Sequence, residues 1–244
     1  EIYTLSLHDA LPIWSCKRDY AVVMKILIHA CPQRMWYVEG FLIPMLQAQG
    51  ADDIEIWNDT EHKGNLQACM DSFAVRIGDG GTWHIQDDVL PARDFVKRCC
   101  EHDEGIVYGF CCEQFRDDPQ QTGKVYLADA WHSFQCVRIP DAYAREYVAW
   151  VRGGKWKTES PHPELPILWE MGKGDDSFFS EFIASRHPYD VAENLKPNLV
   201  EHVDWIIGGS ILHKYREYFA KAYYWEDEAL VDELKEAVKG KIQY

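Results

Sequence analysis

The chain lacks any apolar run that approaches the ~20 residues of a membrane-spanning helix. It also lacks a C-x-x-C pair, although its eight cysteines include two adjacent pairs, Cys99-Cys100 and Cys111-Cys112. A zinc site and a secreted disulfide framework are therefore weak interpretations, and reduced thiols that pack in the core are favoured. We expect a soluble, cytoplasmic protein that does not bind membranes.

Positive charge is scarce. The chain has 25 Lys and Arg against 40 Asp and Glu, which gives a formal net charge of −15. An acidic surface argues against strong non-specific binding to nucleic acid, although a local basic patch remains compatible with it. The length of 244 residues suits one α/β domain with a substantial core.

The first residues do not read as part of a fold. Residues 1–13 match, residue for residue, the translation of one reading frame of a common sequencing-library adapter. We expect residues 1–23 to be a non-native or unstructured leader, the natural chain to begin at Met24, and the source to be metagenomic or phage DNA. Because this leader holds three negative and two positive charges, the remaining domain, residues 24–244, has a net charge of −14.

Three apolar runs, each with the look of a buried strand, end in polar residues. Lys25–Ala30 is followed by Cys31-Pro32-Gln33-Arg34, and Asp53–Trp57 is followed by Asn58-Asp59-Thr60. The third run, Gly81–Leu90, contains the adjacent carboxylates Asp87 and Asp88. In an open α/β sheet, ligands bind at the carboxyl ends of the strands. Burying two adjacent carboxylates is costly unless a cation neutralises them, and a divalent metal that holds a diphosphate would do so. The alternative is a solvated turn after a strand.

Helical patterns alternate with these runs. Apolar residues recur at helical spacing in 36–49, 63–75, 94–102, 141–152 and 178–183, and further strand-like runs are 105–112, 124–127 and 131–139. We predict one mixed α/β domain whose central sheet is mostly parallel, with a helical tail over 215–238. The Gly- and Pro-rich stretch 152–166 is predicted to be a loop.

Two later motifs carry candidate site residues. Asp175 and Asp176 open the helical run after Gly174, where a single Asp would be a helix cap but a second is left over. His202 lies in the short apolar run Pro197–Val203, either as a core histidine or as a metal ligand.

The order of these motifs resembles that of the GT-A glycosyltransferases, which transfer a sugar from a nucleotide diphosphate to an acceptor hydroxyl. The resemblance covers nearly all of Met24 to about Leu212. It rests on the loop after the first strand, the acidic end of the second, the metal motif of an apolar strand, an acidic pair that opens a helix, and a late histidine. In this chain they are His29 to Arg34, Asp59, Gln86-Asp87-Asp88, Gly174-Asp175-Asp176 and Pro197 to His202.

The resemblance implies a GT-A-like, Rossmann-like domain and a role for each motif. Asp88 and His202 would hold Mn²⁺, or Mg²⁺, and the nitrogen ligand favours Mn²⁺. Asp176, or failing that Asp175, would be the general base of an inverting reaction. Gln86 departs from the family, which usually has a carboxylate there, but can bind a ribose hydroxyl. The donor, with UDP favoured, would be bound by Cys31, Arg34, Asp59, Lys63, Asn65, Gln86 and Asp87.

The acceptor is left open. Trp131 would shape the sugar pocket, and Lys155, Trp156 and Lys157 interleave cations with an aromatic ring, which suits a polyanion such as phage-type DNA with a hydroxymethylated base. A saccharide is at least as compatible with the sequence. The sugar, the stereochemical outcome and the oligomeric state are also open.

Two other classes of protein fit part of the pattern. A sugar nucleotidyltransferase would use the same sheet and metal, but the loop H-A-C-P-Q-R has no glycine for a phosphate loop. A non-catalytic nucleotide-sugar binding module is favoured by Gln86 alone.

Overall fold

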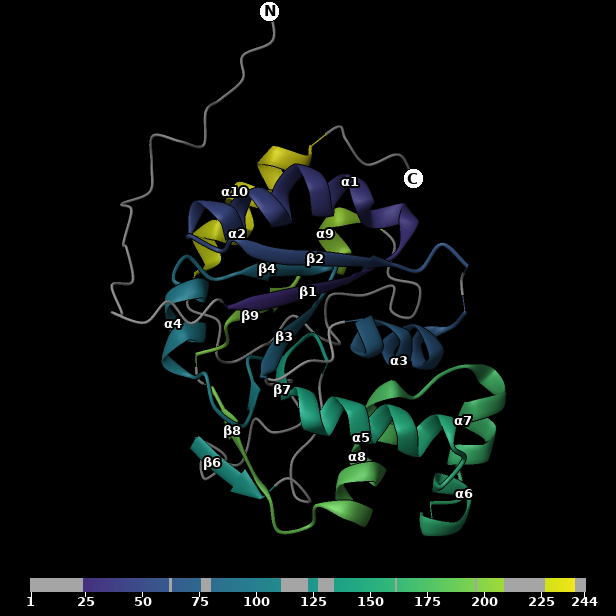
Figure 1. The fold of residues 1–244 in the computed structure, drawn as a ribbon. Coiled ribbons are helices and arrows are strands. Elements are labelled where there is room, and N and C mark those ends of the chain that lie inside the picture. The colour runs from purple at the N-terminus through teal and green to yellow at the C-terminus, as the bar shows by residue number, and fades with distance from the viewer. Residues whose placement is uncertain are drawn as a thin grey trace, which may run out of the picture.

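The computed structural model describes residues 24–61, 63–75, 80–110, 123–126, 134–160, 162–195, 197–208 and 227–239. The expected leader, residues 1–23, lies outside this part of the chain. The described residues form a layered α/β structure in which helices cover both faces of a twisted sheet (Figure 1). Among the described helices, none is long and apolar enough to cross a bilayer.

The central sheet has seven strands in the order β2-β1-β3-β7-β5-β8-β6. β1 is parallel to β2 and β3, and β5 is parallel to β8, whereas β7 and β6 pair with their neighbours in antiparallel fashion. The predicted mixed, mostly parallel sheet is confirmed. The strands are β1 (Lys25–Ala30), β2 (Asp53–Asn58), β3 (Gly81–Gln86), β5 (Ile106–Tyr108), β6 (Gly123–Tyr126), β7 (Cys136–Pro140) and β8 (Val191–Asn194).

A second, two-stranded sheet holds β4 (Val89–Pro91) against β9 (Val200–His202). The apolar run Gly81–Leu90 was expected to be one strand, and this is wrong. The chain turns at Asp87 and Asp88, so that Val89 and Leu90 leave the main sheet and pair with β9 instead. The two carboxylates therefore lie at the junction of both sheets.

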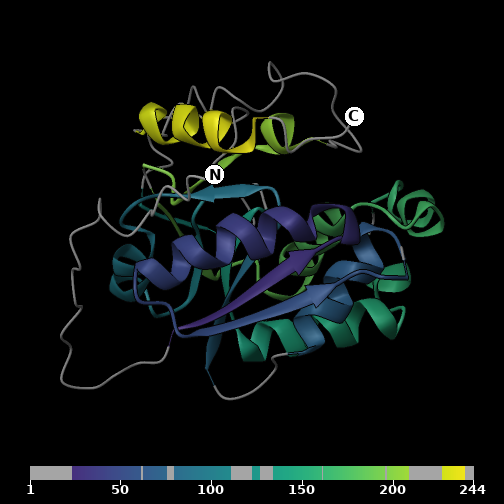
Figure 2. The same cartoon turned by 90° about the horizontal axis from the view of Figure 1, so that it is seen from above.

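The helices divide between the two faces of the main sheet. In Figure 1, most of the first group lies above β1 and β2, one helix of it, α4, lies at the left edge of the sheet, and the second group lies below β1; Figure 2 shows α9 and α10 as an outer layer. The first group is α1 (Met35–Tyr37), η3 (Val38–Leu42), α2 (Ile43–Ala48), α4 (Phe95–Glu101), α9 (Asp204–Ile207) and α10 (Glu228–Val238). The second is α3 (Asn65–Val75), α5 (Asp141–Arg152), α6 (Trp156–Glu159), α7 (Leu165–Met171) and α8 (Asp175–Arg186). Of the predicted tail over 215–238, residues 215–226 lie outside the described chain.

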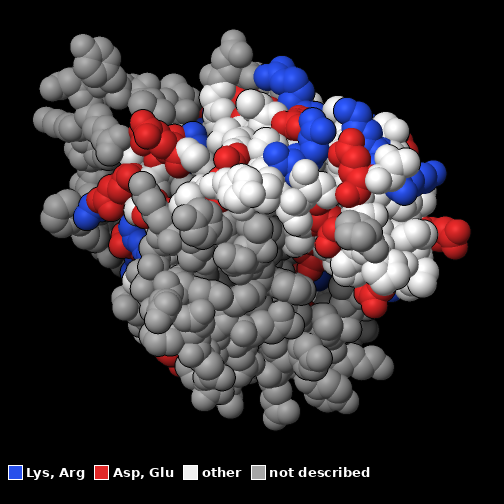
Figure 3. Space-filling view, turned by 90° about the horizontal axis from the view of Figure 1, so that it is seen from below, with Lys and Arg blue, Asp and Glu red and all other residues white. Residues whose placement is uncertain are grey.

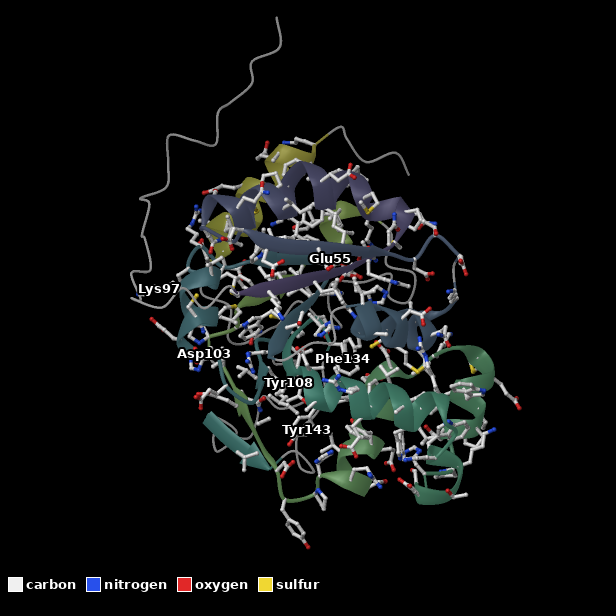
Figure 4. All side chains as sticks on the ribbon, in the orientation of Figure 1. Glu55, Lys97, Asp103, Tyr108, Phe134 and Tyr143 are labelled. Atoms are coloured by element: carbon white, nitrogen blue, oxygen red, sulfur yellow. The ribbon has the colours of Figure 1, made fainter. Side chains whose placement is uncertain are left out.

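Each face of the sheet has its own apolar core, because side chains alternate along a strand. Ile26 and Ile28 of β1 pack under α1 and α2, and Leu230 of α10 joins the same cluster. Tyr108 of β5 and Phe134 belong to the other cluster, with α3, α5 and α8, and Figure 4 shows both rings inside the molecule beside α5. The two cores hold the sheet rigidly from both sides.

The chain crosses from one face to the other around β1. The connection from β1 to β2 runs through α1 and α2 on one face, and the connection from β2 to β3 runs through α3 on the opposite face (Figures 1 and 2). β2 and β3 therefore flank β1 on opposite sides. In doubly wound sheets, the crevice outside the carboxyl ends at such a reversal is where ligands bind.

The stretch 152–166, predicted to be a loop, contains α6 and the start of α7. The reason is burial of Trp156, whose side chain is only 3% exposed and packs against Trp169 and Phe178. Tertiary packing of one indole thus overrides a Gly- and Pro-rich composition.

Gly64 fixes the approach of the start of α3 to the turn between α7 and α8. Its φ is +88°, and a Cβ there would lie 2.6 Å from the carbonyl oxygen of Gly172. Gly64→Ala is expected to lower the free energy of unfolding by roughly 1–3 kcal/mol through clash and strain. Gly105→Ala is the control, because Gly105 has a φ of +69° but open space around it. Thermal denaturation of both variants measures the difference; an equal loss for the two would contradict the contact.

Candidate functional site

The junction between the two sheets holds a buried group of charges. Asp87 and Asp88 are 4% and 6% exposed, and one nitrogen of Arg34, Nη1, lies 2.7 Å from Asp87 Oδ1 and 2.7 Å from Asp88 Oδ2. The backbone N–H of Cys31 also donates to Asp87 Oδ2 at 2.7 Å. The loop after β1 and the turn after β3 are therefore joined by charge, as expected for adjacent parallel strands.

His202 enters the same group from β9. Its Nε2 lies 3.3 Å from Asp88 Oδ2, and its Nδ1 lies 3.3 Å from Asp204 Oδ1. β9 places it there because His202 pairs with Val89, and because the N–H of Val203 donates to the carbonyl of Asp88. The two predicted metal ligands, 114 residues apart in sequence, are neighbours in the structure.

The charges shift one another's ionisation. Burial and the charge of Asp88 raise the pKa of Asp87, with Arg34 opposing both. Burial would also raise the pKa of Asp88, but His202 and Arg34 outweigh it and hold that pKa well below its usual range. The pKa of His202 is raised, because Asp88 and Asp204 outweigh its burial. Asp88 is therefore the ionised carboxylate of the pair.

The residues present fit a divalent cation in part. Asp88 Oδ1 is buried without a hydrogen-bond partner among the described residues, and the nearby imidazole of His202 adds a nitrogen donor. In the part of the chain that the structure describes, no group of three or more His, Cys, Asp or Glu side chains is arranged to hold a metal. An ion here would therefore have two protein ligands and would complete its shell with oxygens of a bound diphosphate or water.

A second polar group lies where α3 and α8 begin. Asn65, the first residue of α3, donates from Nδ2 to Oδ1 of Asp175, the first residue of α8, at 2.8 Å. The N–H of Leu66 donates to the carbonyl of Gly172 at 3.2 Å, which joins the start of α3 to the turn between α7 and α8. Tyr147 donates from below to the carbonyl of Asp175 at 3.2 Å. Asp175 is thereby held through its side chain by Asn65 and through its carbonyl by Tyr147.

The two carboxylates of this acidic pair have different surroundings. Asp175 is 7% exposed, and burial together with the charge of Asp176 raises its pKa to about 7. Asp176 is more accessible, and its Oδ1 accepts from the N–H of the next residue, Ser177, at 2.7 Å. Burial raises the pKa of Asp176 too. The structure thus favours Asp175 over Asp176 as a group that exchanges protons near neutral pH.

Both polar groups lie toward the same edge of the sheet. β1, β2 and β3 run in the same direction, so Arg34 and the Asp87-Asp88 turn follow the carboxyl ends of β1 and β3. The chain leaves the carboxyl end of β2 at Asp59 and enters α3 at Asn65; Figure 1 shows this connection at the right, on the side where β1 also ends. The sheet edge therefore presents a charged group from β1 and β3 and a carboxylate held by α3.

Three other residues that were predicted to bind the donor make contacts of their own near this edge. Asp59 accepts from the N–H of Lys63 at 3.3 Å, and the ammonium of Lys63 pairs with Glu61 and Asp71 at the surface. The structure does not bring Lys63 to the buried carboxylates. Gln86 is half-buried at the end of β3, directly before Asp87, and its N–H donates to the carbonyl of Gln135.

The predicted acceptor residues are only partly brought together. Lys155 and Lys157 are exposed, but the ring of Trp156 is buried between them and so is not available for stacking. Trp131 lies outside the described residues. On the face shown in Figure 3, Lys and Arg side chains alternate with Asp and Glu and form no continuous basic area among the described residues.

Sequence reasoning missed Asp204 and the environment of His29. Asp204 lies two residues after His202, and its Oδ1 is 3.3 Å from Nδ1 of that imidazole. His29 of β1 packs edge-on to Trp57, and burial lowers its pKa to about 4, so that it is neutral beside the charged group. The spacing of His202 and Asp204 is the one signal that the sequence offered.

Comparison with known proteins identifies no close relative: no family model and no curated protein matches the chain. Among solved structures, it is similar to a putative glucose-1-phosphate thymidylyltransferase from Bacillus anthracis, in complex with a sucrose (9% identity, TM-score 0.40, covering 91% of this chain and 96% of that one). It is also similar to the inositol-1-phosphate CTP transferase from T. maritima, with 7% identity and a TM-score of 0.42 over 92% of this chain and 100% of that one. A third similar structure is HddC from Yersinia pseudotuberculosis, with 11% identity and a TM-score of 0.32 over 70% of this chain and 90% of that one. At these identities and TM-scores, the likenesses assign no activity to this chain.

Proposed function

We propose that the protein is a metal-dependent glycosyltransferase, which moves a sugar from a nucleotide-diphosphate sugar to a hydroxyl acceptor. For the nucleotide of the donor we propose uridine diphosphate, which the resemblance to the GT-A enzymes favours. The observation that carries the proposal is Asp175, a buried carboxylate with a pKa of about 7, placed toward the same sheet edge as the Asp88 and His202 pair.

A neutral hydroxyl is a poor nucleophile and needs a base, whereas a phosphate is already an anion. A carboxylate with a pKa near 7 is suited to take up a proton at neutral pH, and general-base catalysis contributes ~10²–10⁴ in rate. Asn65 binds one oxygen of Asp175, so the other oxygen would accept the proton of the acceptor hydroxyl as that hydroxyl attacks the sugar. This division of roles favours transfer to a hydroxyl over transfer to a phosphate.

Asp88 and His202 would hold the metal, and Asp204 would orient the imidazole. When bound, the metal supplies positive charge to the leaving diphosphate. Cys31 and Asp59, which follow the carboxyl ends of β1 and β2, would face the nucleotide. Asp87 is held by Arg34 and by the backbone of Cys31, so its role would be to fix the β1 loop against the β3 turn.

The second candidate is a sugar nucleotidyltransferase, and Arg34 is the observation that favours it. A cation in the loop after the first strand suits the triphosphate that such an enzyme binds. The products separate the two candidates. With Mn²⁺, a nucleotide sugar and an acceptor, the transferase forms nucleotide diphosphate; with nucleoside triphosphate and a sugar 1-phosphate, the nucleotidyltransferase forms pyrophosphate. Pyrophosphate alone would replace our proposal with the second candidate, and a binding module would form neither product.

For the acceptor, we propose a saccharide hydroxyl. The buried ring of Trp156 removes the stacking surface on which the idea of a modified DNA base rested. Lys155 and Lys157 are exposed and remain available to an anionic group on the acceptor.

Reversing both charges tests the acceptor side. Lys155→Glu with Lys157→Glu is expected to reduce transfer to an anionic saccharide on the order of tenfold or more at low salt, because attraction becomes repulsion. Hydrolysis of the donor, which needs no acceptor, should stay unchanged. Initial rates with a neutral and an anionic acceptor check this. An equal change for both acceptors would contradict an acceptor role for the two lysines.

A further inference from the structure

Arg34 lies where a bound metal would need room. Its Nη1 contacts Asp87 and Asp88 at 2.7 Å each, and the Oδ2 atom of Asp88 that it contacts also faces Nε2 of His202 at 3.3 Å. The guanidinium side chain is only 11% exposed. One oxygen of Asp88 is thus shared between a cation of the chain and the imidazole that would bind the metal.

A guanidinium and a divalent ion cannot both occupy this position. The single positive charge of the guanidinium and the double charge of the metal ion, within about 5 Å of each other, would repel strongly in a buried site. Without any cation, however, two adjacent buried carboxylates would be left uncompensated, which is also costly. One cation must therefore replace the other, and the long side chain of Arg34 can move whereas the Asp87-Asp88 turn is held by β3 and β4.

We propose that Arg34 is a resident counter-ion, which neutralises Asp87 and Asp88 in the protein without metal and moves to the diphosphate when the metal binds. The inference rests on the proposed function, because it takes the metal site from Asp88 and His202. It gives Arg34 two successive partners: the carboxylates first, then the phosphate oxygens, which match a guanidinium equally well.

The position of Arg34 in the chain supports this exchange. It ends the short 3₁₀ turn η2 (Pro32–Arg34), which follows β1, and the two residues before it, Pro32 and Gln33, are exposed. The backbone beside it is fixed by Cys31, whose N–H is bound to Asp87. Movement of the Arg34 side chain would therefore leave the β1 loop in place.

The test compares Arg34→Gln with Arg34→Lys, which keeps the charge, in the full chain. Calorimetric titration with Mn²⁺ alone should show binding on the order of tenfold or more tighter for the Gln variant than for the wild type, because the competing charge is gone. The Lys variant should stay close to the wild type. Titration with UDP in saturating Mn²⁺ should give the opposite order, with the Gln variant on the order of tenfold weaker.

These two titrations change in opposite directions only if Arg34 exchanges partners. Equal or weaker Mn²⁺ binding by Arg34→Gln would overturn the inference while leaving the metal site intact. Mn²⁺ binding that Asp88→Asn does not weaken would instead overturn the proposed function. If Arg34→Gln is poorly folded without metal, its melting temperature provides the second measurement: added Mn²⁺ should raise it by more than it raises that of the wild type, and an equal or smaller rise would contradict the exchange.

Discussion

Asp175→Asn is expected to reduce the rate of transfer by ~10²–10⁴, because the acceptor hydroxyl loses its base. The amide keeps the shape of the carboxylate and can still accept the hydrogen bond from Asn65. Affinity for the donor should therefore change little. Steady-state kinetics with donor and acceptor varied in turn would show a fall in kcat; a loss confined to the KM of the donor would contradict the assignment. Asp176→Asn is the matched control and should retain most of the activity.

The same residue predicts a dependence on pH. Since the pKa of Asp175 is about 7 in the folded protein, transfer by the wild type should rise with pH up to about 7 and then level off.

The free energy of unfolding should fall with rising pH, whereas the rate of transfer rises. Between pH ~4 and ~7 the unfolded chain has released the proton that folded Asp175 retains, so the free energy of unfolding should fall with rising pH across this window, by roughly 2–4 kcal/mol in all. Urea denaturation at pH 5 and pH 8 measures this, and Asp175→Asn should remove most of the slope.

Asp88→Asn carries the second large effect. The amide keeps the size of the side chain but removes the charge that faces His202 and the metal position. We expect Mn²⁺-dependent binding of UDP to weaken at least ~10²-fold, equivalent to about 3 kcal/mol. Asp204→Asn, which acts only through the orientation of His202, should weaken metal binding ~10–100-fold. Titration calorimetry measures both; UDP binding that needs neither Mn²⁺ nor Asp88 would contradict the metal site.

The sequence predicted most strands and most helices because their patterns are local, but it missed β8, Val191–Asn194, a short strand without a clear apolar run. β1 and α5 begin and end at the predicted residues. An apolar run that ends in polar residues defines β1, and Pro140 together with the apolar periodicity after it defines α5. The split of 81–90 into β3 and β4 was not predictable, because Val89 and Leu90 pair with a strand more than 100 residues away. The helices within 152–166 depend in the same way on burial of Trp156.

In the candidate site too, features set by local patterns were predicted, and features set by contacts between distant segments were not. The positions of Asp87, Asp88 and Asp175 at the ends or starts of elements followed from local patterns. Which residue neutralises the first pair did not: a metal was predicted, and in this structure the neighbouring cation is Arg34. The sequence put Asp176 ahead of Asp175 as the base, and that choice stays a prediction; our proposal takes Asp175 because its burial and its bond from Asn65 depend on how the starts of α3 and α8 pack, which no local pattern shows.

The most direct test of the account is the release of nucleotide diphosphate from a panel of nucleotide sugars with Mn²⁺, by the chain that begins at Met24 and by its Asp88→Ala variant. We predict slow release from one donor by the first protein and none by the second, with a large increase when the right acceptor is added. No release from any donor, together with no shift in melting temperature on adding any nucleotide, would contradict the account and leave the Asp87-Asp88 turn as a structural ion pair with Arg34.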